Sequence, residues 1–435
     1  MDNRLSRIRR TAARAGVTVV LGTFFAVAVG AGASPAKAQG WQGKEETRDG
    51  VVHVLNPAEP GSAAVVLTPK ELWRTGGDSD EEDVLFGVVA QITSDDSGNV
   101  YALDAQLNQV VIFSPDGKYL RSIGREGEGP GEFQRPSDLF LSPDGNIAVM
   151  QRMPGRIVLL TPEGEPAGDM RVPGPEDGGM QMFGGGRLAA DHVVLNVNRF
   201  SRRDAGFSTI TSLIAVDSSG SLMAKYFEKS DESDFANMVF DEKKLSMGAL
   251  VWSVGQDGRV FTSDDFDAYR IRVWNADGSL ARVIEREYTH RKRSAEEMKR
   301  YVPVVRIRQG DRTQGPEVKA SETDRDIQQV FPRENGDIWV LSSKGALDAP
   351  KGMLCTFDVF DASGKLIRQI TLTGTGSWAQ DGYFVVGDRF YVVTGLRSAR
   401  RAMFGAGEGA EDEEEADEPM TLICYSLGAG ARGEK

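Results

Sequence analysis

Cysteine and histidine are both scarce in this sequence, and their scarcity limits the chemistry that the protein can carry out. Among 435 residues there are only two cysteines and three histidines. Cys355 and Cys424 allow at most one disulfide, and the sequence leaves open whether they are bridged or remain buried free thiols. The histidines, His53, His192 and His290, lack the spacing of zinc ligands. A zinc enzyme built on several histidines is therefore not expected.

Signatures of nucleophilic catalysis and of phosphate binding are also missing. No G-x-S-x-G motif occurs, so the turn that presents a catalytic serine in many hydrolases is not predicted. The glycine-rich segment Gly124–Gly131 lacks the G-K-[ST] ending of a phosphate loop, and Pro130 removes one backbone N–H that could bind phosphate. We therefore expect no organic cofactor and lean towards a protein that is not an enzyme.

Long apolar runs are missing except near the N-terminus. There, an arginine-rich stretch precedes the apolar run Val17–Val29 and the A-x-A sequence Ala36–Ala38. This order is typical of a secretory signal peptide, so residues 1–38 are expected to be removed and the mature protein to be periplasmic or secreted. The alternative is an uncleaved membrane anchor, for which this apolar run is short.

Basic residues are fewer than acidic residues, with 51 lysines and arginines against 64 aspartates and glutamates. The net charge is −13 for the whole chain, and because residues 1–38 contain six basic residues and one acidic residue, it is −18 for the remainder. An electrostatic field of this sign repels nucleic-acid phosphates and anionic lipid. Nucleic acid is therefore not an expected partner, and no membrane span is expected after signal cleavage.

Glycine, in contrast, is abundant, with 50 residues. The segments Asn99–Asp104, Gln109–Phe113 and Lys118–Gly124 alternate apolar and polar residues, and the turn Ser114–Gly117 separates the last two. This pattern predicts antiparallel strands joined by tight turns. The plan of four strands recurs along the chain and gives six copies.

The last copy lacks a fourth strand, because the chain runs into the glycine-rich tail Gly428–Lys435. Glu71–Thr75 has the pattern of such a strand and can complete that sheet. The expected fold is all-β: a six-bladed β-propeller with four-stranded antiparallel blades, whose N-terminal strand closes the last blade and hides its free edge. The expected layout is a signal peptide at 1–38, a segment with the closing strand at 39–78, the propeller at 79–430 and a tail at 431–435.

One inter-blade linker carries a family resemblance. The segment Gly124–Phe133, followed by Arg135 and Pro136, resembles the linker of NHL repeats. The chain as a whole is similar to bacterial exported proteins described as six-bladed β-propellers. The resemblance implies the fold and leaves the chemistry open, because NHL-type propellers include binding proteins and a few enzymes.

Two insertions interrupt the repeat. The first is basic and spans about 289–326, where the capping box Ser294–Glu297 predicts a helix from about Ala295 to Tyr301. Its cations indicate either a patch for an anion or partner, or a solvated helix against the blades. The second insertion, at about 405–418, is rich in glycine and acidic residues and is expected to be disordered.

The function favoured by the sequence is a non-enzymatic binding scaffold. Loops from every blade of a propeller gather at one mouth of the central tunnel and could bind a protein, peptide or glycan. The competing interpretation, which we favour for each candidate residue taken singly, is a solvated surface residue. The candidates for ligand binding are Arg125, Glu126, Gln151, Arg152, Arg156 and Arg270.

A calcium-dependent enzyme is the alternative, either a lactonase-like hydrolase or a lyase with its site at the tunnel. Calcium binds oxygen ligands, and the acids that follow the second strands of two blades, Asp104 and Asp265, are the candidate metal ligands. The competing interpretation is structural. In NHL-type repeats, an aspartate at this position commonly accepts hydrogen bonds from backbone N–H groups and fixes the blade turn.

Overall fold

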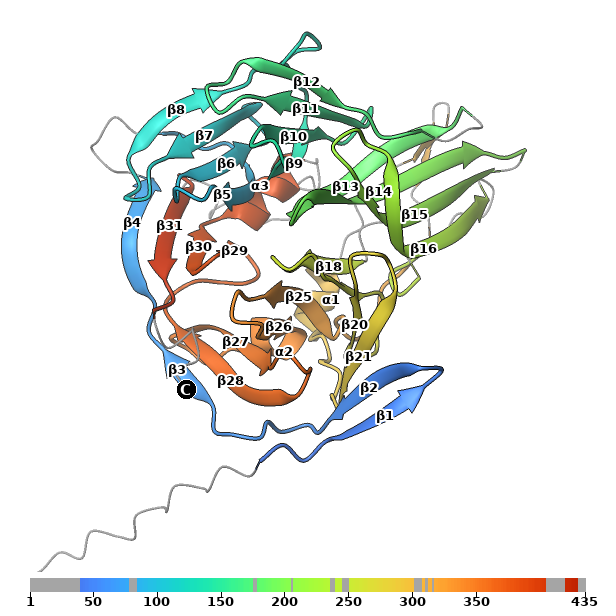
Figure 1. The fold of residues 1–435 in the computed structure, drawn as a ribbon, viewed down its shortest axis with the longest axis vertical. Helices are drawn as coiled ribbons and strands as arrows, with labels where there is room; N and C mark the ends of the chain where they lie inside the picture. The colour runs from blue at the N-terminus through green and yellow to red at the C-terminus, as the bar shows by residue number, and fades with distance from the viewer. Residues whose placement is uncertain are drawn as a thin grey trace, which may run out of the picture. The chain divides into compact units, whose positions relative to one another are not determined.

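The short alternating runs of the sequence form the sheets that were expected from it (Figure 1). The computed structural model describes residues 40–77, 84–174, 178–204, 206–234, 239–244, 250–300, 307–309, 312–314, 317–403 and 419–428. The proposed signal peptide and the acidic insertion at 405–418 lie outside these ranges. The account below concerns residues 38–435, which form one unit.

The first three blades are consecutive four-stranded antiparallel sheets. Blade 1 contains β5 (Val89–Ser94), β6 (Val100–Asp104), β7 (Gln109–Phe113) and β8 (Tyr119–Ile123). Blade 2 contains β9 (Pro136–Leu141), β10 (Ile147–Gln151), β11 (Arg156–Leu160) and β12 (Pro166–Met170). Blade 3 contains β13 (Met180–Ala189), β14 (His192–Arg202), β15 (Gly206–Val216) and β16 (Leu222–Asp234).

The other three blades follow the same order, and the last one is completed from the N-terminus. Blade 4 contains β18 (Val251–Val254), β19 (Val260–Ser263), β20 (Arg270–Trp274) and β21 (Leu280–Arg286). Blade 5 contains β25 (Ile327–Pro332), β26 (Ile338–Ser342), β27 (Met353–Phe360) and β28 (Leu366–Thr373). Blade 6 contains β29 (Gly382–Val386), β30 (Arg389–Val393), β31 (Thr421–Ser426) and, antiparallel to β31, β4 (Lys70–Gly76). The six-bladed propeller closed by an N-terminal strand is thus confirmed.

The N-terminal segment does more than close the last blade. Before β4 it forms β1 (Lys44–Arg48), β2 (Val51–Asn56) and β3 (Val65–Leu67). β2 pairs parallel with the outer strand of blade 4, and β3 pairs parallel with the outer strand of blade 5. These pairings satisfy backbone groups along outer sheet edges. They were not predicted, and they enlarge two of the four-stranded blades to six and five strands.

A single buried amide joins this segment to blades 4 and 5. Asn56 is 3% exposed, and its amide nitrogen donates to the carbonyl oxygens of Glu285 (3.0 Å) and Gly364 (2.9 Å). Its side-chain oxygen accepts hydrogen bonds from the Leu366 backbone N–H (2.7 Å) and the Trp41 indole (2.8 Å). Because all of these groups are satisfied by one side chain, Asn56 fixes the segment where it crosses between the two blades.

The apolar core lies between neighbouring blades. Each adjacent pair of blades shares one cluster of buried side chains; the cluster between blades 1 and 2, for example, includes Leu103, Ile123, Phe133 and Val149. The two cysteines belong to such clusters, on β27 and β31, and both are buried free thiols. Burial raises the pKa of Cys424 to about 11, so this thiol stays protonated and unreactive at neutral pH.

Trp73 of β4 connects the closing strand to blade 1. Its indole N–H donates to the Pro115 carbonyl oxygen (3.2 Å), and its ring lies 5.9 Å from that of Phe113. The ring also covers the turn at Gly117, where φ is +85° and an added Cβ would lie 2.4 Å from Trp73. Glycine is therefore required at this turn for both backbone conformation and space.

We expect Gly117→Ala to destabilise the protein more than Gly145→Ala. Both glycines have positive φ, so both substitutions incur backbone strain of about 1–2 kcal/mol, but only Gly117 faces a side chain, because nothing lies within 4 Å of a Cβ at Gly145. Urea denaturation of the two variants measures the difference in unfolding free energy. Equal losses would mean that Trp73 is not held against this turn.

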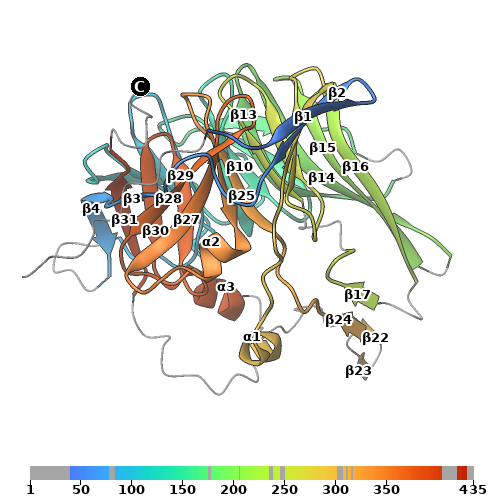
Figure 2. The ribbon, with the colours of Figure 1, turned by 90° about the horizontal axis from the view of Figure 1, so that it is seen from below.

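The basic insertion contains the predicted helix. α1 spans Ala295–Arg300, and the Ser294 hydroxyl accepts a hydrogen bond from the Glu297 N–H, while the Glu297 carboxylate accepts one from the Ser294 N–H (3.2 and 2.7 Å). Two short pairs lie nearby, β17 (Val239–Asp241) with β24 (Glu317–Lys319), and β22 (Ile307–Gln309) with β23 (Arg312–Gln314). Figure 2 shows these pairs and α1 on the same side of the propeller as α2 (Ser343–Leu347) and α3 (Leu396–Met403).

Two cations of the insertion are neutralised by acids within it and in neighbouring segments. Arg291 forms ion pairs with Glu297, Asp324 and Asp348 at 2.6–2.8 Å. Arg293 forms ion pairs with Glu242 and Asp324 at 2.6 and 2.8 Å. These two arginines therefore hold the insertion together and are not part of a patch that attracts anions.

The ion pair of Glu297 should make the insertion sensitive to acid. Arg291 lowers the pKa of Glu297 from 4.5 to about 2, so the stabilisation is present above about pH 4.5 and is lost as the pH falls towards 2. We expect the unfolding free energy of Glu297→Gln to depend less on pH in this window than that of the wild type. Thermal unfolding at several pH values measures this, and an unchanged pH dependence would contradict it.

Candidate functional site

The linker candidates are occupied by contacts within the linker. The Arg125 guanidinium donates to the Glu132 carboxylate at 2.7 Å, and Glu126 forms a parallel β-bridge with Phe133. The pKa of the Glu132 carboxyl is lowered, mainly because it accepts a hydrogen bond from the Gly129 N–H and to a smaller extent because it accepts one from Arg125. Arg125 and Glu126 therefore shape the crossing between blades 1 and 2.

Gln151, Arg156 and Arg270 are also engaged. Gln151 is buried, and its side chain accepts from the Gln134 N–H and donates to the Pro154 carbonyl oxygen. Arg156 forms an ion pair with Asp169 at 2.9 Å. Arg270 forms ion pairs with Asp265 (2.9 Å) and Glu285 (3.0 Å), and lines a cavity of about 320 Å³ that also contains His290 and Asp326.

Arg152 is the exception among the predicted residues. It follows β10 directly, it is exposed, and no hydrogen bond or ion pair of its side chain is found within the described ranges. The hydrogen bonds of the neighbouring Gln151 shape the loop from which Arg152 projects. Four of the six candidates meet at the linker between blades 1 and 2: Arg125 and Glu126 belong to it, Gln151 accepts from its Gln134 N–H, and Arg156 donates to the carbonyl oxygens of Glu132 and Gly129. Arg270 lies apart from them in blade 4, so the structure does not bring all six into one site.

The two candidate metal ligands lie in different blades. The Asp104 carboxylate is fully buried and accepts hydrogen bonds from four backbone N–H groups, those of Gly87, Val88, Gln106 and Leu107. This is the structural role that was expected for it. Asp265 instead forms an ion pair with Arg270 in blade 4. In the described part of the chain, no three His, Cys, Asp or Glu side chains come together in an arrangement that could hold a metal ion.

Asp138 joins the inner strands of three blades. It lies on β9, and its carboxylate accepts a hydrogen bond from the Gln91 amide of β5 at 2.8 Å. From β13 it accepts the Gly186 N–H (3.0 Å) and the Arg187 guanidinium (2.8 Å). Arg187 in turn lies 5.6 Å from the ring of Trp252 on β18. Inner strands of four consecutive blades are therefore linked through one carboxylate and one guanidinium.

We expect Asp138→Ala to lower the unfolding free energy by about 3 kcal/mol, because the buried Gly186 N–H loses its acceptor and the part-buried Gln91 amide and Arg187 guanidinium lose the carboxylate that they share. Asp169→Ala is the matched control: it also removes an Asp–Arg pair, but its carboxylate is 39% exposed, and pairs of this kind contribute at most about 1 kcal/mol. Urea denaturation compares the two. Similar losses would show that Asp138 does not link the blades.

Arg400 approaches the same region from the sixth blade. It lies on α3, in the connection between β30 and β31, and its guanidinium donates to the carbonyl oxygens of Ala90 (2.6 Å) and Val89 (3.4 Å) on β5. Figure 1 shows α3 beside β5 and β9 at the inner side of the ring. No ion pair between Arg400 and a carboxylate is found among the residues that the structure describes. Within the described ranges, the partners of its guanidinium are therefore neutral carbonyl groups.

Other arginines lie near Arg400. Burial is the main factor that lowers its pKa, and the positive charges of Arg397 and Arg152 lower it further, while the negative charge of Asp138 opposes them. Arg397 donates to the Asp381 carbonyl oxygen at 3.2 Å, and its guanidinium lies 5.3 Å from the ring of Trp378. We call Arg152, Arg187, Arg397 and Arg400 the mouth arginines. Asp138, the carboxylate near them, already accepts a hydrogen bond from one of the four.

Three of the mouth arginines were missed by the sequence analysis. For the two on α3 a signal exists: arginines at 397 and 400 alternate with apolar residues at 396, 399 and 403, which is the spacing of an amphipathic helix. For Arg187, the glycine run before it obscured its place on an inner strand. Nothing in the local sequence indicates that Arg400 reaches blade 1, because the carbonyl groups that it contacts are 310 residues away.

The six sheets, their order and their closure define the class of protein as a six-bladed β-propeller. A family model described as "6-bladed beta-propeller" matches residues 80–173. No match was found among curated proteins. The described residues contain no helix long and apolar enough to cross a membrane.

Several solved structures are similar in fold. A Bacteroides fragilis protein described as exported is 14% identical, with a TM-score of 0.46 over 86% of this chain and 99% of its own. Virginiamycin B lyase from Staphylococcus aureus is 10% identical, with a TM-score of 0.39 over 81% and 99% of the two chains. Regucalcin from Agrobacterium tumefaciens is 12% identical, with a TM-score of 0.39 over 84% and 97%. At these identities the similarities assign neither ligand nor activity to this chain.

Proposed function

We propose that this propeller is a binding protein that takes a small carboxylate-bearing ligand at the mouth arginines. One observation carries the proposal: Arg400 is held only by carbonyl oxygens among the described residues, close to Arg152 and Arg397. The repulsion between these partly desolvated cations is only partly offset by Asp138, whose carboxylate already accepts a hydrogen bond from Arg187, and it raises the free energy of the empty site. An anion that binds there relieves both the repulsion and the lost hydration.

Guanidinium groups favour carboxylates, because the planar fork of N–H donors matches two oxygens of one acid group. Arg152 is exposed and has no partner in the described part of the chain, so it is free to take such a group. The strongly negative body disfavours long polyanions. A short acidic peptide or a small acidic sugar fits these conditions better than a charged polymer.

We also propose that the protein is an exported, NHL-like propeller of the periplasm or cell exterior. The arginine-rich, apolar and A-x-A succession in residues 1–38 supports export, and the linker Gly124–Phe133 supports the NHL-like type. Cell fractionation of the full chain, with mass spectrometry of its N-terminus, tests the location. Recovery of the uncleaved chain from the cytoplasm would contradict it.

The ligand site is tested with the chain 39–435 and two end-blocked dipeptides, Glu-Glu and Gln-Gln, by isothermal titration calorimetry at low salt. The acidic dipeptide should bind and the neutral one should not. Arg152→Gln should weaken binding by about tenfold, because one charge-assisted hydrogen bond contributes about 1.5 kcal/mol or more.

Arg202→Gln serves as the control for the loss of one positive charge. Arg202 is an exposed residue at the end of β14, which Figure 1 shows directed away from the ring. Its substitution should leave the affinity unchanged. Equal binding of the two dipeptides, or equal losses in the two variants, would contradict a site at the mouth arginines.

A further inference from the structure

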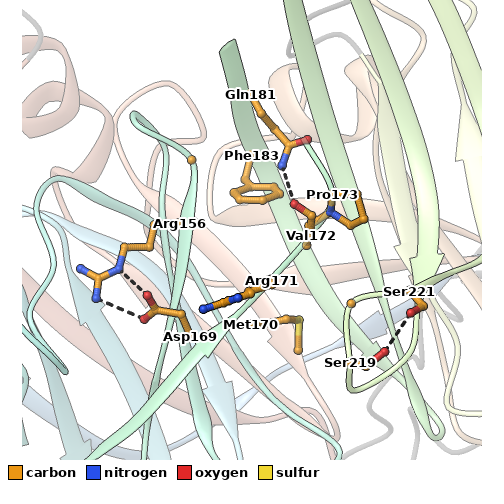
Figure 3. A pocket seen from close by; sticks show the side chains of 12 residues that line it. Arg156, Asp169, Met170, Arg171, Val172, Pro173, Gln181, Phe183, Ser219 and Ser221 are labelled. Carbon is orange, nitrogen blue, oxygen red and sulfur yellow. Dashed lines mark hydrogen bonds and ion pairs between the residues drawn. The ribbon is translucent and has the colours of Figure 1, made fainter. Parts of the chain in front are cut away.

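A separate cavity lies between blades 2 and 3 (Figure 3). Its volume is about 500 Å³, which is within the range of small-molecule sites. The cavity is bounded by the end of β12 with the chain that follows it, by the start of β13, and by the turn before β16. None of the mouth arginines lines it.

One wall of the cavity is apolar. Phe183 and Met170 are 3% and 7% exposed and belong to the core cluster that blades 2 and 3 share, and Val172 packs against that cluster. The apolar wall therefore rests on the fixed core of two blades. An apolar ligand body placed against it would lose contact with water without the protein having to rearrange.

The lining also includes one cation that has no partner among the described residues. Arg156 is satisfied by Asp169, to which it donates at 2.9 and 3.2 Å. Arg171, next in the chain after Met170, is exposed, and no hydrogen bond or ion pair of its side chain is found in the part of the chain described. Figure 3 shows Arg171 between the Arg156–Asp169 pair and Met170. Asp169, the acid near Arg171, is thus already paired with Arg156.

The backbone around Arg171 is fixed by a close approach. Gly220 has φ of +82°, and a Cβ there would lie 1.5 Å from the Arg171 carbonyl oxygen, so the turn at Ser219–Ser221 packs directly on the chain after β12. Asp217 holds this turn, because its carboxylate accepts hydrogen bonds from the N–H groups of Ser219 and Ser221. Both walls of the cavity are therefore formed before any ligand binds.

We propose that this cavity is a second binding site, distinct from the mouth arginines, for a small amphipathic anion. The ligand has an aromatic or alkyl body, which contacts Phe183 and Met170, and one carboxylate or sulfonate, which pairs with Arg171. The serine hydroxyls of the turn lie at the cavity edge and suit a ligand with a polar rim. This class of ligand follows from the combination of one apolar wall with one guanidinium that has no partner in the described part of the chain.

The probe is 8-anilinonaphthalene-1-sulfonate, an aromatic sulfonate whose fluorescence rises when its rings leave water. With the folded chain 39–435 we expect saturable binding. Arg171→Glu should weaken this binding by at least about tenfold, because it replaces an attractive charge with a repulsive one. The melting temperatures of all variants are compared, so that fluorescence from a partly unfolded chain is recognised.

A second variant tests whether the probe occupies the cavity itself, independently of the charge of Arg171. Ser221→Phe places a bulky side chain at an exposed position of the lining and should also abolish probe binding. Arg202→Glu is the matched charge control and should bind the probe as the wild type does. Probe binding that is unchanged in Arg171→Glu and Ser221→Phe, or that is lost in Arg202→Glu, would overturn the proposal.

Discussion

Closure of the ring by β4 is the constraint on which the rest of the structure depends. Five blades are made from strands that are consecutive in the chain, whereas the sixth needs the pairing of β4 with β31 from opposite ends of the sequence. Trp73 extends this pairing to blade 1 through Phe113. Blades 6 and 1 are the two that Arg400 bridges, from α3 to the carbonyl groups of β5. The proposed ligand site therefore forms only when the two ends of the chain have met.

The parts of the fold that could be predicted are those that the sequence encodes locally. Alternating apolar residues and tight turns predict strands, and the pattern of Glu71–Thr75 was enough to assign the closing strand. The parallel pairings of β2 and β3 were not predictable, because they use only backbone groups on outer edges that no turn connects. The role of Asn56 is hidden for the same reason: its acceptors at Glu285 and Gly364 are 229 and 308 residues away.

The candidate site was predictable only in part, because the sequence shows which residues are charged but not which charges are paired. Arg152 and Arg156 are equally plausible ligand-binding residues from the sequence, yet Asp169 forms an ion pair with Arg156 and not with Arg152. The insertion gives a similar lesson. One of the two interpretations of its cations was a site for an anion or partner, but Glu242, contributed by the chain between blades 3 and 4, neutralises Arg293. Such pairings depend on where distant segments meet, which is decided by the packing of the blades.

The net negative charge of the protein does not prevent an anion from binding at the mouth arginines, because salt screens the more distant acidic residues. At physiological ionic strength the Debye length is about 8 Å, so a ligand among the mouth arginines is affected mainly by those arginines and by Asp138. A small acid can lie entirely within that distance. A long polyanion cannot, since most of its length would extend over a surface that carries an excess of acidic residues. At the proposed site, the charge distribution would therefore favour a small carboxylate over a polymer of the same sign, without any contact that is specific for length.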